Sequence, residues 1–107
     1  MTMGHVLHPK AQEELEGLVE YFLEIDPRLG VAFQERYREH LERVKQTPEL
    51  FRERKHGVRR VNLAPRFEEY FIAYLLWREQ IVIVAVGHGK RRPYYFRDRI
   101  DEAKCME

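Results

Sequence analysis

The run Ile81–Val86 constrains this sequence most, because it is apolar at every position. It is far shorter than the roughly 20 residues that a membrane span requires, and its length suits one strand of a sheet. A strand with no polar positions has no face suited to water, so both of its faces must be covered. We therefore expect a small soluble fold in which this strand lies buried inside a sheet.

A helical hairpin is predicted in the first half of the chain. Pro9 follows His8, and Pro27 follows Asp26, so each proline opens a helix at the position where its missing N–H costs least. The second helix is expected to end before Pro48. Apolar residues recur at helical spacing and predict two buried stripes: Leu15, Leu18, Val19, Phe22 and Ile25 in the first helix, and Phe33, Tyr37, Leu41 and Val44 in the second.

The second half of the chain changes to the period of strands. A strand is expected over Val58–Leu63, with Arg60 on the face opposite Arg59, and another over Tyr70–Trp77, followed by a turn. A short first strand is expected within Met3–His8. The predicted fold class is α+β: an N-terminal strand, a helical hairpin packed on a small, mainly antiparallel sheet in the order β-α-α-β-β-β, and a short C-terminal helix or tail.

Composition indicates one domain spanning 1–107, with no internal disulfide because Cys105 is the single cysteine. The lack of an apolar leader and the single cysteine favour the cytoplasm. The net charge of +1 is unevenly distributed. Residues 1–53 carry 7 Lys and Arg against 11 Asp and Glu, whereas residues 54–107 carry 12 against 7. This division predicts a basic surface for a polyanion in the second half.

Several patterns together carry a family resemblance. The longest is Ala85–Arg99, where a buried strand ends in Gly and His and leads into basic residues, aromatic residues and a closing Arg. The others are the first-helix spacing, the proline after the second helix, and the two strands that follow: Ala11, Leu15, Leu18 and Tyr21; Pro48; Arg59 and Arg60; Arg66, Phe67, Tyr70, Ile72 and Tyr74. In this order the chain resembles the RelE/ParE superfamily of bacterial type II toxins over roughly residues 6–100. It departs from many members at Phe67–Tyr70, which is longer and more acidic than their turn into the third strand.

The resemblance implies a growth-arresting toxin with a cognate antitoxin as its partner and with no cofactor, metal or membrane. RelE-like members cut mRNA on the ribosome, whereas ParE-like members poison DNA gyrase without nuclease activity. The basic loop that runs into Tyr94 and Tyr95 favours mRNA cleavage, and the lack of a strong acid–base pair favours the gyrase alternative. A non-toxic homologue that still binds an antitoxin is the third alternative.

RNA cleavage by the adjacent 2′-hydroxyl requires proton transfer and stabilisation of charge on the phosphate. Family members that cut RNA rely on Arg, Lys and Tyr. Arg66 and Arg91 are the candidate phosphate clamps, because guanidinium groups match phosphate oxygens. Tyr95 is the candidate that stacks on a base or moves a proton, and packing of its ring onto the sheet is an equal alternative.

The predicted nucleic-acid-binding surface combines two basic segments, and its affinity is expected to fall steeply with salt. Its residues are Lys55, Arg59, Arg60, His88, Lys90, Arg92 and Arg97. His88 directly follows a buried strand, which favours a structural role over a catalytic one. The histidines do not have zinc-ligand spacing, and Cys105 has no neighbouring histidine in the sequence, so no metal site and no cysteine nucleophile are predicted.

Overall fold

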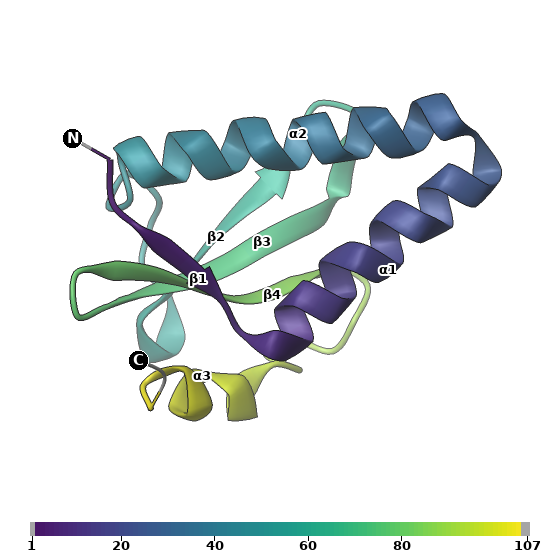
Figure 1. The fold of residues 1–107 in the computed structure, drawn as a ribbon. Helices are drawn as coiled ribbons and strands as arrows, with labels where there is room; N and C mark the ends of the chain where they lie inside the picture. The colour runs from purple at the N-terminus through teal and green to yellow at the C-terminus, as the bar shows by residue number, and fades with distance from the viewer. Residues whose placement is uncertain (1, 106–107) are drawn as a thin grey trace.

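The computed structural model describes residues 2–105, and these form one mixed sheet with helices on both of its faces (Figure 1). The elements in chain order are β1 (His5–Leu7), α1 (Pro9–Ile25), α2 (Pro27–Gln46), the 3-10 turn η1 (Lys55–Gly57), β2 (Val58–Leu63), β3 (Phe67–Trp77), β4 (Gln80–His88) and α3 (Arg97–Ala103). This order confirms the predicted α+β fold class, including the short C-terminal helix.

The sheet has the strand order β1-β4-β3-β2. β1 pairs with β4 in parallel, and the β4–β3 and β3–β2 pairs are antiparallel. β4 is therefore an inner strand, as its apolar sequence predicts.

Both faces of β4 are buried, each against a different cover. On one face Ile81 and Ile83 join a core with the helical hairpin, which includes Phe22, Phe33 and Tyr37. On the other face Val82 and Val84 join a second core, to which the C-terminal segment contributes Phe96, Ile100 and Ala103. The sheet is thus the middle layer between α1 and α2 on one side and α3 on the other (Figure 1).

The starts of α1 and α2 follow the local rules of helix capping. The Nδ1 atom of His8 accepts the N–H of Lys10 at 3.1 Å, and Asp26 accepts the N–H of Arg28 at 2.9 Å. These side chains satisfy amide donors that have no partner within the helix. The hairpin is consequently fixed at its two helix starts by residues that its sequence makes recognisable.

Two details differ from the sequence-based expectations. Ile25 is 58% exposed and does not belong to the buried stripe of α1, because the helix ends there at the tip of the hairpin. Phe67–Tyr70 is part of β3 and not a turn, since the Phe67 ring packs at 5.2 Å from that of Phe33. A register shift between Ala73 and Tyr74 interrupts the β3–β4 ladder.

None of the helices within residues 2–105 is both long and apolar enough to cross a membrane.

The substitution Phe22→Ala tests the packing of α1. Phe22 is 7% exposed, and its ring lies 5.0 Å from that of Phe33. We expect the free energy of unfolding to fall by about 3–5 kcal/mol, because a cavity replaces a buried ring. The neighbouring Tyr21 is 54% exposed, so Tyr21→Ala is the control and should cost less than about 1 kcal/mol. Urea unfolding followed by circular dichroism measures both, and equal small losses would contradict this packing.

Candidate nucleic-acid interface

A pocket of about 220 Å³ opens on the face of the sheet that α3 covers in part. β2, β3 and the segment after β4 contribute its walls. Its lining residues are mostly basic or aromatic: Arg54, Val58, Arg60, Phe71, Ala73, Gly89, Arg91, Arg92, Pro93, Tyr94, Tyr95 and Phe96.

Two arginines of the pocket stack on aromatic rings. The guanidinium of Arg60 lies 4.0 Å from the centroid of Phe71, and that of Arg91 lies 3.8 Å from the centroid of Tyr95. Burial, and secondly the charge of Arg54, lower the pKa of Arg60 from its usual value. Such stacking holds each cation in place by its flat face, while the N–H donors at its edge suit a ligand.

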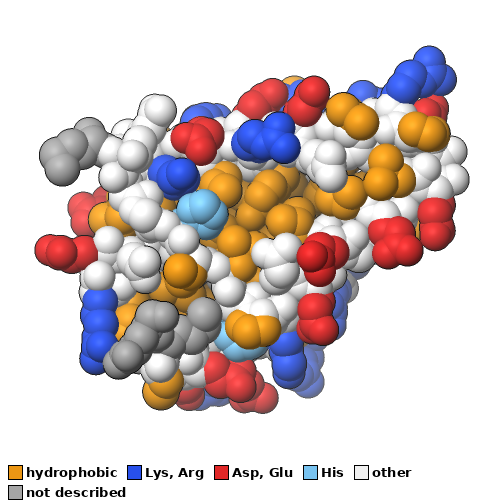
Figure 2. All heavy atoms as spheres, in the orientation of Figure 1, with side chains coloured by type: hydrophobic (Ala, Val, Ile, Leu, Met, Phe, Trp, Pro, Cys, Tyr) orange, Lys and Arg blue, Asp and Glu red, His pale blue; other side chains and the backbone are white. Residues whose placement is uncertain are grey.

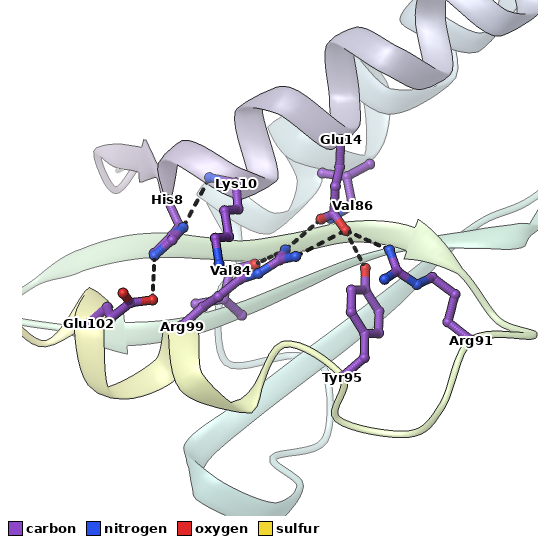
Figure 3. Close-up of polar contacts among 9 residues, drawn as sticks. All are labelled: His8, Lys10, Glu14, Val84, Val86, Arg91, Tyr95, Arg99 and Glu102. Atoms are coloured by element: carbon purple, nitrogen blue, oxygen red, sulfur yellow. Dashed lines mark hydrogen bonds and ion pairs between the residues drawn. The ribbon is translucent and has the colours of Figure 1, made fainter.

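Glu14 lies where α1, β4 and the C-terminal segment meet (Figure 3). Its carboxylate accepts the backbone N–H of Val86 at 3.1 Å and the hydroxyl of Tyr95 at 2.8 Å. Two guanidinium groups also donate to it, that of Arg99 at 2.7 Å and that of Arg91 at 3.2 Å. The side chain of Glu14 is 14% exposed, so these donors replace most of the water that a carboxylate requires.

The hydroxyl of Tyr95 donates its hydrogen bond to the carboxylate of Glu14. Burial, and then the hydrogen bond to Glu14, raise the pKa of Tyr95 well above its ordinary value. Tyr95 therefore contributes its ring to the pocket, whereas its proton is held by Glu14.

The structure brings some predicted site residues together at the pocket. Arg60, Arg91, Arg92 and Tyr95 line it. Arg92 also lines an adjoining hollow of about 300 Å³, to which Arg97 contributes. Exposed residues extend this basic surface along the chain: Lys55 follows the lining residue Arg54, and Lys90 precedes Arg91.

Arg66 is not brought together with Arg91 and Tyr95. It lies in the turn between β2 and β3, with φ of 81°, and its guanidinium is 5.7 Å from the ring centroid of Phe67, on the hairpin side of the sheet. The pKa of Asp26 is lowered mainly by hydrogen bonds from Arg28 and to a smaller extent by the charge of Arg66. Arg66 is therefore a neighbour of the α1–α2 junction.

Two further candidates have mainly structural contacts. Arg59 donates to the carbonyl of Phe51 at 2.6 Å and to the carboxylate of Glu53 at 3.3 Å, on the opposite face from Arg60. His88 has its Nε2 atom 3.2 Å from Glu69, and its Nδ1 atom accepts the N–H of Lys90 at 3.0 Å. These contacts support the structural interpretation of His88.

Four residues that shape the site are not among the predicted site residues. Arg54 lines the pocket, His56 lies beside it with its ring 5.8 Å from that of Tyr94, and Glu14 and Arg99 form the centre of the carboxylate cluster. By residue type, Glu14 is only an acidic residue near the start of a helix. Its spacing is more informative: it lies three residues after Ala11 and four before Leu18, which places it beside the apolar stripe of the helix.

A second concave surface lies between α1 and α2. Figure 2 shows apolar side chains gathered between the two helices with charged side chains around them. This groove of about 490 Å³ is separate from the basic pocket, and its lining residues are Gln12, Leu15, Glu16, Val19, Glu20, Leu23, Gln34, Tyr37, Arg38 and Leu41.

Across the described residues 2–105, no three or more His, Cys, Asp or Glu side chains are grouped in a way that would hold a metal ion.

The fold is that of a RelE-like toxin. Among solved structures, a mutant of the E. coli toxin RelE in the free state matches with a TM-score of 0.65 and 15% sequence identity, over 95% of this chain and 97% of that chain. No curated protein matches the chain.

A comparison of the sequence with models of protein families identifies the family of this chain. The model of the family described as "ParE toxin of type II toxin-antitoxin system, parDE" matches residues 6–93, which is most of the chain. The chain therefore belongs to the ParE toxin family, within the RelE/ParE superfamily.

The substitution Tyr95→Phe measures how strongly the C-terminal segment is tied to Glu14. Loss of a hydrogen bond to a charged group should lower the free energy of unfolding by about 1.5 kcal/mol, the lower end for such bonds, because Glu14 keeps its other donors. Tyr94→Phe is the matched control and should change the free energy by less than about 0.5 kcal/mol. Chemical unfolding measures the difference, and equal effects would contradict the role of the Tyr95 hydroxyl.

Proposed function

We propose that this toxin binds single-stranded RNA in the basic pocket and arrests growth by cutting mRNA on the ribosome. The observation that supports this most is the pair of stacked arginines, Arg60 on Phe71 and Arg91 on Tyr95, beside one pocket. Guanidinium groups match phosphate oxygens, and unpaired bases stack on aromatic rings and on guanidinium planes. The pocket therefore has the chemistry that an unpaired nucleotide requires.

The geometry supports the following roles in cleavage. Arg91 and Arg60 stabilise the charge that develops on the scissile phosphate, and Tyr94 offers a ring to a base. In this proposal His56, whose ring lies 5.8 Å from that of Tyr94, takes the proton of the attacking 2′-hydroxyl. The bond between phosphorus and the leaving 5′-oxygen breaks, and water supplies the proton for that oxygen. Arg66 has no role in this proposal, because its turn lies by the helical hairpin.

Poisoning of DNA gyrase without nuclease activity is the second candidate. The hydrogen bond from Tyr95 to Glu14 favours it, because a tyrosine with a raised pKa is a poor proton donor or acceptor near neutral pH. In that case the arginines and Tyr94 contact a protein target by binding alone.

A cognate antitoxin is the partner that the family implies. We propose that its segment covers the groove between α1 and α2, since the apolar floor there includes Leu15, Val19 and Leu23. An amphipathic helix has the shape and the apolar face for such a groove.

The substitution Arg91→Ala tests the nuclease proposal. It should reduce mRNA cleavage by about 10²–10³-fold, the cost of removing one donor that stabilises transition-state charge, and growth arrest should be lost. Arg28→Ala is the matched control, since it removes the same charge from a side chain that is 92% exposed at the start of α2. Primer extension on cellular mRNA after induction measures cleavage, beside a gyrase cleavage assay on supercoiled DNA.

The two assays distinguish the candidates. Cuts in translated mRNA with unaffected gyrase would support the nuclease and exclude the gyrase poison. Trapped gyrase–DNA complexes with intact mRNA would do the reverse, and Arg91→Ala should then weaken poisoning by a smaller, graded amount. Tyr95→Phe should abolish mRNA cleavage if its hydroxyl moves a proton, and should leave cleavage intact if only its ring takes part.

Expression of the chain tests the requirement for an antitoxin. Induction of the chain alone should stop growth, and co-expression of a short antitoxin-like protein from the neighbouring reading frame should restore it. Colony counts with and without the second frame measure the effect. Unchanged growth at high expression of the chain alone would overturn the toxin proposal and favour a non-toxic, antitoxin-binding homologue.

A further inference from the structure

The positive charges around Glu14 outnumber its single negative charge. One carboxylate faces two guanidinium groups, and these differ in how firmly they are held. Arg99 is 11% exposed, donates to both oxygens of Glu14 and also to the carbonyl of Val84 at 3.1 Å. Arg91 is 52% exposed and contacts Glu14 through one nitrogen at 3.2 Å. Arg99 alone balances the charge of Glu14, so Arg91 is the cation that can leave.

Arg91 also lies between two hollows. It lines the basic pocket, and it lines a second hollow of about 230 Å³ to which Glu14 and Leu18 contribute. Figure 3 shows its side chain reaching from the loop after β4 towards Glu14 on α1. This half-exposed side chain therefore borders both hollows.

We propose that Glu14 is a positioning residue that competes with bound phosphate for Arg91 and thereby sets the affinity of the pocket for RNA. In the free toxin Glu14 holds the guanidinium of Arg91 at α1. A phosphate group in the pocket draws it away, and Arg99 still balances the charge of the Glu14 carboxylate. The choice of RNA as the ligand rests on the proposed function, whereas the competition itself rests on the Glu14 contacts.

Binding of an RNA that cannot be cleaved tests this competition. The probe is a six-nucleotide single strand with a 2′-O-methyl group on every sugar, which removes the attacking hydroxyl. Glu14→Gln keeps an oxygen for the donors of Val86 and Arg99 but removes the charge that holds Arg91. We expect this variant to bind the probe about two- to fivefold more tightly, the effect of releasing one partly exposed ion pair.

The control is the adjacent exposed carboxylate. Glu13→Gln removes the same charge from α1, and Glu13 is exposed, so it reports the general electrostatic effect and should change affinity by less than about 1.5-fold. In an Arg91→Ala background, Glu14→Gln should bring no gain at all. An equal gain from both glutamine variants, or a gain that persists without Arg91, would overturn the proposal.

A measurement on the unmodified protein removes dependence on the folding of Glu14→Gln. In ¹⁵N-labelled wild-type toxin, the side-chain Nε–Hε signal of Arg91 should shift as the probe is added, with the same midpoint as binding. The corresponding signal of Arg99 should stay in place. A stationary Arg91 signal at saturation, or no binding of the probe, would overturn the proposal.

These results are separate from the test of the proposed function. A shift of Arg91 and a gain for Glu14→Gln, without any cut mRNA in cells, would support the competition and contradict the nuclease. Cut mRNA together with equal probe affinities of wild-type and Glu14→Gln toxin would do the opposite.

Discussion

The carboxylate of Glu14, with its side chain only 14% exposed, makes the interactions on which the C-terminal half of the structure depends. Removing a charge from water is costly unless hydrogen-bond donors surround it, so each donor fixes a segment relative to α1. The N–H of Val86 ties β4 to α1, and Tyr95 and Arg99 tie the segment that follows β4. A second contact, 3.1 Å between His8 and Glu102, joins the start of α1 to α3. The loop that walls the basic pocket is consequently held at both of its ends.

The attachment of the C-terminal segment provides the second cover that the apolar strand β4 needs, because both faces of this strand must be buried. The helical hairpin covers one face of the sheet, and Phe96, Ile100 and Ala103 cover part of the other. These residues lie beyond 6–93, the range that matches the family, and yet they complete the second core. Where the C-terminal cover leaves β2 and β3 uncovered, Phe71 forms the floor of a pocket with arginines around it. The pocket is therefore a product of the same two-sided burial that the sequence of β4 demands.

Local signals made the layers predictable, and the lack of local signals explains what was missed. The apolar run Ile81–Val86 and the proline at each helix start are read from adjacent residues, and the structure confirms the elements that they predict. The exposure of Ile25 and the inclusion of Phe67 in β3 depend on where the hairpin ends and on contacts with Phe33, which are distant in the sequence. The partners of Glu14 are more distant still, since Arg99 follows it by 85 positions. No spacing rule connects such residues, so the candidate site was identified only through its basic and aromatic half.

The arginines show why composition alone cannot define this site. Arg59 and Arg60 are neighbours in the sequence, but alternation along a strand places their side chains on opposite faces of the sheet. The guanidinium of Arg59 donates to the carbonyl of Phe51 and to the carboxylate of Glu53. Arg91 and Arg99 share Glu14, but the side chain of Arg99 is 11% exposed and donates to both carboxylate oxygens, whereas that of Arg91 is 52% exposed and donates through one nitrogen. Arg60 and Arg91 instead lie against rings, which uses their flat faces and leaves N–H donors at their edges. The pocket is thus lined by arginines whose ring contacts orient the guanidinium group and leave N–H donors available for a ligand. Arg59 and Arg99 instead donate to protein groups and stabilise the fold around the pocket.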